Sequence, residues 1–384
     1  MKKILVVGAG REGKGYLGEV FSMAGWQVTF LDSDPQVIQA LQKGTYEVKE
    51  YRADSTEVRQ ISGYTALTYD DSEALAKAVM EADIITLCLY PHDISSALEQ
   101  LTIYLKQRVS QCPQKHLALF PCTNENRLVP GICKQLTNAF SNEEKQWFKQ
   151  WVTVSDSIVR RPVGAESSFS LSVEAGVVCP MLVGVPLCVD ISDVPWMKTC
   201  RENMETLKDL KVHTINTAHA ATAYAGYLKG YRFIDEAKAD PEIQALIAGV
   251  LAESVPVLAN VYGVSEESLW ELAVFPDSKD AFCDPVTRVA YDPIRKLSRH
   301  DRLTENAVLC QKNGTDNHYL IYAMACAMAY DDQNDPAAQC IQARIRENGI
   351  LSAIAQTTGL DMQDEIVAKV AEEWKTIKAS VLHP

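Results

Sequence analysis

Short apolar runs alternate with helical patterns through the first half of the chain. Continuous apolar runs, which are typical of strands buried on both faces of a parallel sheet, lie at residues 4–7, 27–31, 83–89 and 116–121. The segments between them with helical spacing are 15–24, 35–43, 72–81 and 94–109. This alternation predicts a doubly wound α/β sheet, with a small hairpin or extra strands within 46–67 and further strands at 152–159 and within 168–183.

The pattern turns entirely helical after residue 194. The predicted helices, separated by Gly, Pro and Asp, are 198–210, 214–229, 241–262, 265–273, 303–312, 317–330, 335–346, 349–357 and 363–380. We therefore predict two domains, an α/β domain over residues 1–192 and an all-α domain over residues 193–384.

A glycine-rich turn directly follows the first apolar run. Gly8, Gly10 and Gly13 form the pattern G-x-G-x-x-G, which permits a tight turn, close approach of a pyrophosphate, and helix–strand packing. Asp32 ends the next strand, 19 residues past Gly13, where its carboxylate can bind both ribose hydroxyls and repel a 2′-phosphate. The combination predicts a Rossmann-type domain that binds NAD rather than NADP. The alternative is a similar fold that binds another nucleotide or none.

Other polar residues of this half follow the predicted strands. The carboxyl ends of parallel strands meet at one edge, so we expect Tyr90 near the nicotinamide ribose and Asn126 in the same cleft. Asn124 fits equally well as the cap of a following helix. Arg11 and Lys14 are expected to be solvated, with a phosphate contact as the alternative for either.

The second half contains an amine, an amide and an imidazole within nine residues. On one helix, Lys211, Asn216 and His219 fall within an arc of roughly 140°. A lysine whose pKa is lowered by burial can accept a proton, an amide can hold a developing alkoxide, and an imidazole can orient a hydroxyl. The structural alternative is an exposed lysine, a capping asparagine and a core histidine.

The segment 284–303 is basic in a chain that is acidic overall. Arg295, Lys296 and Arg302 belong to it and can form an anion site, such as one for a sugar phosphate. The alternative is a helix–helix connection held by Arg–Asp pairs. Arg161, at the end of the predicted strand 152–159, is a further candidate for the anion.

Composition excludes several classes of function. The net charge of −13 argues against nucleic-acid binding, and no apolar run reaches the roughly 18 residues of a membrane span. The N-terminal apolar run is too short for a signal peptide. The eleven cysteines form no C-x-x-C pair, so we expect reduced cytosolic thiols and no metal site.

Together these motifs resemble the polyol-specific long-chain dehydrogenases. The resemblance covers nearly the whole chain: the glycine turn with Asp32, the Asn126 region, Asp156-Ser157, Val173-Glu174, Lys211-x4-Asn216-x2-His219, and Pro293-x-Arg-Lys-Leu-x-x-x-Asp-Arg-Leu303. It implies a Rossmann domain followed by an all-helical domain, with the site between them. It also implies metal-free hydride transfer between NAD and a small-molecule polyol or sugar phosphate. Lys211 would be the general base, Asn216 and Asn126 would polarise the reacting oxygen, and His219 would orient the substrate.

The sequence departs from that family around the presumed phosphate and sugar contacts. Arg160-Arg161 replaces an Asp-Arg pair, Asp284-Pro285 replaces Asn-Pro, and Tyr291 replaces a basic residue, while the catalytic trio is intact. A polyol phosphate and its ketose phosphate are the expected substrate pair. The alternatives are a sugar-acid reductase, whose substrate carboxylate would use the same basic residues, and a non-catalytic NAD sensor. We expect a monomer or a small homo-oligomer.

Overall fold

The computed structural model describes residues 1–52, 54–273 and 284–381, and its chain divides into two compact units. The first unit contains residues 1–208, and the second contains 209–273 and 284–381. The division therefore falls after Lys208, later than the predicted boundary at residue 192. It falls there because β13 (Met197–Cys200) pairs with β12 (Met181–Gly184) of the first unit, and α7 (Met204–His213) begins in that unit.

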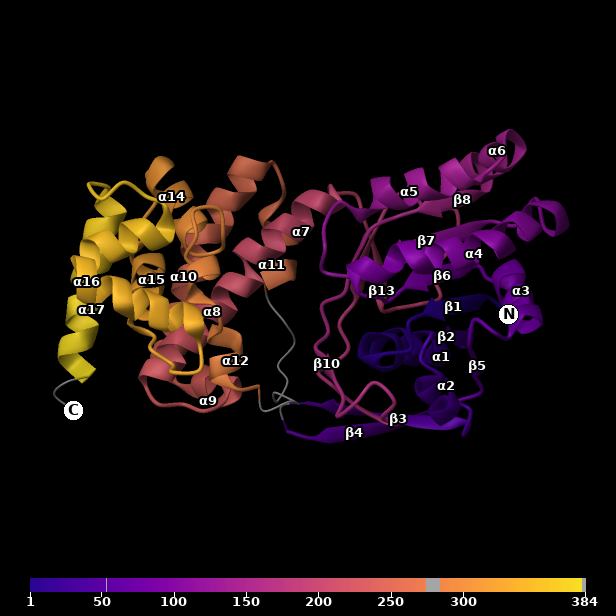
Figure 1. Ribbon diagram of the computed structural model, residues 1–384, viewed down its shortest axis with the longest axis horizontal. Coiled ribbons are helices and arrows are strands. Elements are labelled where there is room, and N and C mark those ends of the chain that lie inside the picture. Colours follow the sequence, from indigo (N-terminus) through magenta and orange to yellow (C-terminus); the bar gives the residue numbers. More distant parts are fainter. Residues whose placement is uncertain (53, 274–283, 382–384) are drawn as a thin grey trace. The chain divides into compact units, whose positions relative to one another are not determined.

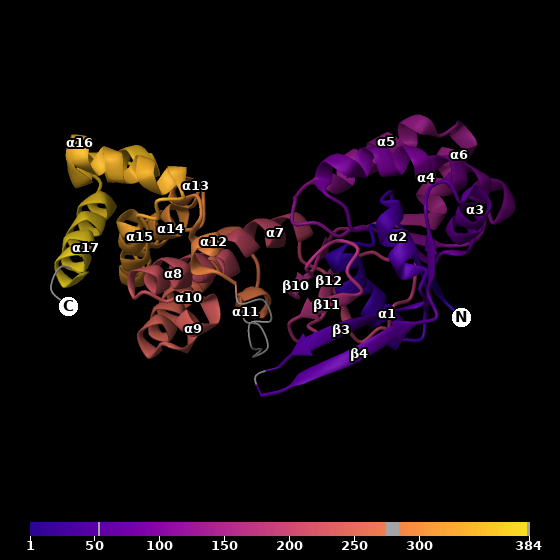
Figure 2. The same cartoon turned by 60° about the horizontal axis from the view of Figure 1, so that its bottom comes forward.

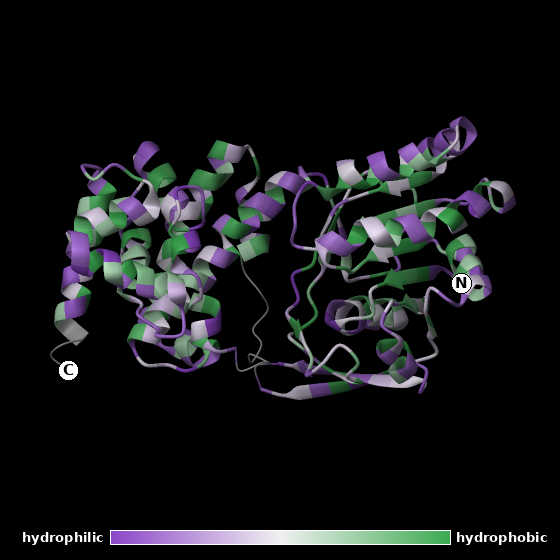
Figure 3. Cartoon of the chain, in the orientation of Figure 1, coloured by the Kyte–Doolittle hydropathy of each residue, from purple (hydrophilic) through white to green (hydrophobic). Residues whose placement is uncertain are grey.

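The predicted apolar runs form one parallel sheet of six strands (Figure 1). Its order is β5-β2-β1-β6-β7-β8, and every neighbouring pair is parallel. The strands are β1 (Lys3–Val7), β2 (Gln27–Leu31), β5 (Thr65–Leu67), β6 (Ile84–Leu87), β7 (Leu117–Pro121) and β8 (Val152–Val154). The strand order reverses between β1 and β6, the position at which doubly wound sheets bind their ligands. Figure 3 shows the apolar strands of this sheet in green.

Helices cover both faces of the sheet. One core lies beneath the π-helical segment η1 (Gly13–Gly18), α1 (Glu19–Met23) and α2 (Pro35–Leu41). The opposite core lies beneath α3 (Ser72–Glu81), α4 (Pro91–Gln111), α5 (Leu128–Ala139) and α6 (Asn142–Trp151). The doubly wound arrangement predicted from the alternation is confirmed, although α5 was anticipated only as the helix that Asn124 could cap, and α6 was not predicted.

Two small sheets complete the first unit. β3 (Thr45–Tyr51) and β4 (Thr56–Ser62) form the expected hairpin, which Figure 2 shows as a long two-stranded ribbon. β11 (Ser172–Ala175) and β10 (Val163–Gly164) extend it, and β9 (Ser157–Ile158) joins β12 and β13. The predicted strand 152–159 is therefore two strands in different sheets.

The second unit is all helical, as predicted. After α7 come α8 (Ile215–Leu228), α9 (Ile234–Ala239), α10 (Pro241–Tyr262), α11 (Glu266–Ala273), α12 (Val286–Ala290), α13 (Pro293–Lys296), α14 (Thr304–Lys312), α15 (His318–Ala329), α16 (Pro336–Thr358) and α17 (Glu365–Val381). Small residues of α8 and α15 pack closely in its core. Gly349, with φ +76°, breaks α16 where two helices were predicted.

α10 is the one described helix that is long and apolar enough to cross a membrane by length and composition, although Glu253 interrupts its apolar run. More than half of its apolar window is buried inside the protein. The carboxylate of Glu253, in its middle, accepts the backbone N–H groups of Tyr319 (2.8 Å) and Leu320 (3.0 Å) at the start of α15. These contacts are those of a core helix.

Candidate active site

In the glycine turn, neighbouring atoms leave no space for a side chain at the first and last glycines, whereas the middle glycine is open. A Cβ on Gly8, whose φ is +95°, would lie 2.2 Å from the carbonyl oxygen of Cys88. A Cβ on Gly13 would lie 2.1 Å from the carbonyl oxygen of Gly8. Among the described residues, no atom lies within 4 Å of a Cβ built on Gly10. The turn therefore requires glycine at the first and last positions and leaves its middle accessible to a phosphate group.

Asp32 is bonded directly to this turn. One carboxylate oxygen accepts the Ala9 N–H at 2.7 Å, and the other accepts the Asp34 N–H at 2.9 Å. Each carboxylate oxygen can accept more than one hydrogen bond, so both retain capacity for ribose hydroxyls. The carboxylate thus holds the turn and remains chemically suited to the predicted ribose contact.

Lys14 is fully buried, contrary to the expectation that it would be solvated. Its Nζ donates to the carbonyl oxygens of Ser168 (2.6 Å) and Ser170 (2.8 Å). Burial lowers the pKa of this lysine to about 8, and Asp32 partly opposes the change. Lys14 ties the helix after the glycine turn to the loop before β11. Arg11 is exposed, as expected.

Tyr90 and Asn126 follow neighbouring strands β6 and β7. Tyr90 precedes α4, is 67% exposed and stacks on His92. Asn126 donates from Nδ2 to the carbonyl oxygen of Glu205 (2.7 Å) and accepts the Arg127 N–H (2.8 Å). Asn126 therefore links the loop after β7 to the first turn of α7.

Lys208 is a buried residue of this region that sequence reasoning missed. Its Nζ lies 2.6 Å from the carboxylate of Asp156 and 3.1 Å from the carbonyl oxygen of Glu125. Asp156 belongs to the Asp156-Ser157 pair on which the family resemblance partly rests. A buried carboxylate needs a basic partner, and that requirement is the sequence signal that could have pointed to Lys208. The pair anchors the first half of α7 in the first unit.

Lys211, Asn216 and His219 belong to the second unit but to two helices. Lys211 is in the last turn of α7, and the other two are at the start of α8. Thr214 separates the helices with φ −108° and ψ −89°. The arc calculated for one continuous helix therefore does not apply, because the backbone turns between the amine and the amide. All three side chains are partly buried.

A buried polar group holds this bend. Asn306 Nδ2 donates to the carbonyl oxygen of His213 at 2.7 Å and to Thr217 Oγ1 at 3.2 Å. Thr217 Oγ1 lies 3.2 Å from the carbonyl oxygen of Arg302. Thr214 Oγ1 donates to the carbonyl oxygen of Leu210 at 2.9 Å. These bonds fix the bend between Lys211 and Asn216 from α14 and from the basic segment.

The imidazole of His219 is held neutral. Burial, followed by the charge of Lys238, lowers its pKa to about 4. A neutral imidazole has one donor and one acceptor nitrogen, which suits the orientation of a hydroxyl.

In the basic segment 284–303, two arginines form the Arg–Asp pairs of a helix–helix connection, whereas one lysine fits an anion site. Arg295 pairs with Asp292 (3.3 Å) and Arg302 with Asp301 (2.7 Å), as expected for a connection held by Arg–Asp pairs. Lys296 differs: it is 5% exposed, donates to the carbonyl oxygen of Tyr291, and forms no ion pair with a carboxylate among the described residues. Burial, followed by Arg295 and Arg302, lowers the pKa of Lys296 to about 8.

Arg161 occupies a different environment from the one predicted. Its guanidinium is fully buried, donates to Glu19, to Glu50 at 2.9 Å, and to the carbonyl oxygens of Gly15 (2.8 Å) and Gly176 (2.6 Å). Two internal carboxylates neutralise it, so its role as a substrate contact is corrected to a structural one. The sequence could not show this because Glu19 and Glu50 are far from Arg161 along the chain.

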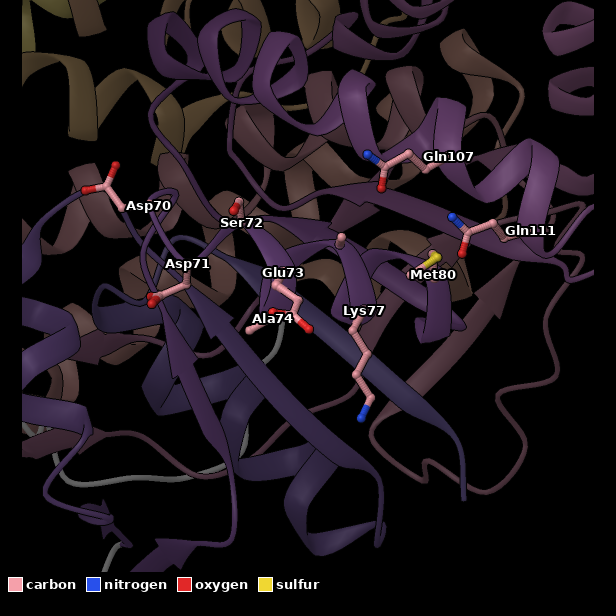
Figure 4. Close-up of a pocket in the computed structure, with 10 residues that line it drawn as sticks. Asp70, Asp71, Ser72, Glu73, Ala74, Lys77, Met80, Gln107 and Gln111 are labelled. Carbon is pink, nitrogen blue, oxygen red and sulfur yellow. The ribbon is translucent and has the colours of Figure 1, made fainter.

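A surface hollow of about 830 Å³ lies beside α3 and α4 (Figure 4). Its lining side chains come from the start of α3, including Glu73 and Lys77, and from the end of α4, with Gln107 and Gln111. None of the predicted site residues lines it, so it is separate from the candidate site.

Cysteine and metal-ligand geometry adds no further site. The ten described cysteines are free thiols, and Cys283 lies outside the described residues. Within residues 1–52, 54–273 and 284–381, no group of three or more His, Cys, Asp or Glu side chains could hold a metal ion.

Comparison with known proteins identifies the family. The family model described as the mannitol dehydrogenase Rossmann domain matches residues 2–180, and the mannitol dehydrogenase C-terminal domain matches residues 203–378. The chain is 27% identical over 98% of its length, and 98% of the relative's length, to a mannitol-1-phosphate 5-dehydrogenase of Thermoanaerobacter pseudethanolicus.

Solved structures share the fold at low identity. A D-sorbitol dehydrogenase in substrate-free form matches with a TM-score of 0.77 and 14% identity, covering 99% of this chain and 93% of that chain. A Pseudomonas fluorescens mannitol 2-dehydrogenase, in a ternary complex with NAD and D-mannitol, matches with a TM-score of 0.64 and 17% identity. The match covers 100% of this chain and 94% of that chain. Because the two family models together match most of the sequence, the chain belongs to the mannitol dehydrogenase family of NAD-dependent polyol dehydrogenases.

Proposed function

We propose that this protein interconverts a polyol phosphate and a ketose phosphate with NAD, with mannitol 1-phosphate and fructose 6-phosphate as the best candidates. The full-length similarity to a mannitol-1-phosphate 5-dehydrogenase supports this substrate pair. The observation that carries the proposal is the buried Lys296, a cation that forms no ion pair with a described carboxylate, in the unit that contains Lys211, Asn216 and His219.

The glycine turn supports NAD as the cofactor. Gly10 leaves space for the pyrophosphate, and the N-terminus of the following helix favours negative charge. Asp32 would accept ribose hydroxyls and would repel a 2′-phosphate. Bound NAD⁺ would supply the hydride acceptor for oxidation of a secondary alcohol.

The protein's side chains would manage the proton and the developing charge. Lys211 would take the proton of the reacting hydroxyl as general base. Asn216 would donate an N–H to the resulting alkoxide oxygen. Asn126, whose Nδ2 donates to the carbonyl oxygen of Glu205, would add a second amide donor. His219, neutral at physiological pH, would orient a neighbouring substrate hydroxyl.

The basic segment would bind the phosphate. Lys296 and Arg302 are largely buried, and Arg295 is more exposed at the same segment. Charge-assisted bonds to a phosphate would stabilise the protonated lysine, which burial otherwise disfavours. We propose a reaction without a metal, in a cytosolic protein that is a monomer or a small homo-oligomer.

A substrate panel tests this proposal. Purified protein is assayed with NADH against fructose 6-phosphate, free fructose and the uronates fructuronate and tagaturonate. We expect the highest kcat/KM for the ketose phosphate. The highest kcat/KM for a uronate would overturn the phosphate assignment and support a sugar-acid reductase.

Replacing the proposed base separates an enzyme from an NAD sensor. Lys211→Ala should lower kcat by about 10²–10⁴-fold, the usual contribution of a general base. NAD binding, measured by titration calorimetry, should persist in the variant. Lys312→Ala, at an exposed position of α14, is the matched control and should retain full turnover. Unchanged turnover in Lys211→Ala would exclude the proposed base.

A further inference from the structure

Two free cysteines follow neighbouring strands beneath the glycine turn. β6 and β7 are parallel, and their last aligned residues are Leu87 and Pro121. The Cys122 N–H donates to the carbonyl oxygen of Leu87 at 2.9 Å, so the ladder continues past that pair. Cys88 and Cys122 are therefore the next residues opposite each other, and both are reduced.

Their side chains point to the same face of the sheet. Side chains alternate along a strand, which places Cys88 on the face of Ile84 and Cys122 on the face of Ala118. Ile84, Ala118 and Cys122 belong to one core cluster and Cys88 packs against the same cluster, which supports the shared face. The thiol of Cys122 is the leading cause, ahead of burial, of the raised pKa of the Cys88 thiol. The aligned register and the shared face place the two thiols next to each other.

This spacing suits a disulfide. Neighbouring strands lie about 4.8 Å apart. Disulfides need Cα atoms about 4.4–6.8 Å apart and side chains directed toward each other. Cys88 is partly exposed, whereas Cys122 is only 2% exposed. The pair thus has one accessible thiol and one internal thiol, the arrangement that an oxidation followed by resolution requires.

We propose that a hydroperoxide converts Cys88 and Cys122 into a disulfide, and that this oxidation weakens dinucleotide binding. The Cys88 sulfur attacks the peroxide, the O–O bond breaks, and one water or alcohol leaves with formation of a sulfenic acid. The Cys122 sulfur then attacks the Cys88 sulfur, the S–O bond breaks, and a second water leaves. The thiols lose two electrons and two protons, and the peroxide gains both.

The effect on the dinucleotide follows from the position of Cys88, and it rests on the proposed function. The Cys88 carbonyl is packed so closely beneath Gly8 that a Cβ there would lie 2.2 Å from it. The disulfide would tie the Cys88 side chain to Cys122, and because the Cys88 carbonyl and Gly8 are packed without spare space, any adjustment of the backbone at Cys88 would be passed on to the glycine turn.

The test uses the full-length protein treated with hydrogen peroxide at mildly alkaline pH, because the raised pKa of Cys88 limits the reactive thiolate. Remaining thiols are blocked, and the protein is digested without reductant for mass spectrometry. We expect a peptide linking Cys88 to Cys122 that dithiothreitol cleaves. We expect the Kd for NAD to rise about threefold or more on oxidation and to recover on reduction.

Three variants serve as controls. Cys88→Ser and Cys122→Ser should bind NAD before treatment and should lose both the linked peptide and the change in Kd. Cys340→Ser, at an exposed thiol, should respond like the wild type. Recovery of Cys88 as a free thiol or a sulfinic acid, without the linked peptide, would overturn the disulfide. A linked peptide with an unchanged Kd would overturn its effect on the dinucleotide. Untreated protein that fails to bind NAD would contradict the proposed function. The linked peptide would in that case still support the disulfide.

Discussion

The buried cations Arg161 and Lys208 of the first unit have carboxylate partners, whereas the buried Lys296 of the second unit forms no ion pair with a described carboxylate. In the first unit, Arg161 donates to Glu19 and Glu50, and Lys208 pairs with Asp156. In the second unit, Lys296 has the carbonyl oxygen of Tyr291 as its partner. Arg295 and Arg302 add to the burial that lowers its pKa.

The difference distinguishes structural cations from candidate ligand contacts. A buried ion pair satisfies its own charge, so an incoming anion gains little from it and would have to displace a carboxylate. A buried lysine beside other cations is destabilised in its charged form, and a bound anion relieves that cost. Burial alone therefore does not mark a binding residue, whereas a buried lysine with neighbouring cations and no ion pair to a described carboxylate is a candidate for one.

The largest effect should follow from removing the structural cation. Arg161→Met leaves Glu19 and Glu50 buried with less compensation and should lower the free energy of unfolding of the first unit by about 3–5 kcal/mol. Urea denaturation monitored by tryptophan fluorescence measures this change. Arg52→Met removes a half-exposed partner of the same Glu50 and should cost at most about 1 kcal/mol. Equal losses would remove the distinction between buried and exposed pairs.

The second effect concerns substrate. Lys296→Met removes a charge-assisted bond and should raise KM for the ketose phosphate about 10–100-fold. KM for free fructose should change little. A uniform rise for both substrates would indicate a structural role, like that of Arg161.

The third effect is a dependence of stability on pH. Lys296 has a pKa of about 8 in the folded protein and 10.5 as its ordinary value. Between these values the unfolded chain holds a proton that the folded chain lacks, so rising pH stabilises the fold. The wild type should therefore gain stability relative to Lys296→Met from pH 8 to 10, by at most about 1.4 kcal/mol per pH unit. Denaturation series at several pH values measure the difference in free energy of unfolding between the wild type and Lys296→Met. A difference that stays constant with pH would contradict the lowered pKa.

The smallest effect should come from the exposed arginine of the same segment. Arg295 is half-exposed and pairs with Asp292, so Arg295→Met should change stability by less than about 1 kcal/mol. KM for the ketose phosphate should rise less than in Lys296→Met. A larger rise would place the principal phosphate contact at Arg295.

The architecture of both units was predictable because it depends on local patterns. Buried strands require continuous apolar runs, and the glycine turn requires glycine at fixed spacings, so β1, the turn and Asp32 follow from neighbouring residues. α6 was predictable but missed. Ser141 and Glu144 form a capping box at its start, and the sequence shows this pattern as a serine followed three residues later by a glutamate.

The partners of buried charges were not predictable in the same way. Arg161, Glu19 and Glu50 meet only after α1, β3 and the loop between β9 and β10 pack together. Asn306 reaches the α7–α8 bend from a distant helix. A break near Thr214 was expected from the predicted helices 198–210 and 214–229, but the arc for Lys211, Asn216 and His219 assumed one helix, and no Gly or Pro signals how sharply the backbone turns there. Long-range contacts, rather than residue type, decide these positions.

The division of the chain inside α7 has a practical consequence for anyone expressing the nucleotide-binding portion alone. A fragment ending at residue 192 would lose the edge strand β13. It would also leave the buried carboxylate of Asp156 without the ammonium group of Lys208. Extending the fragment through Lys208 would restore both.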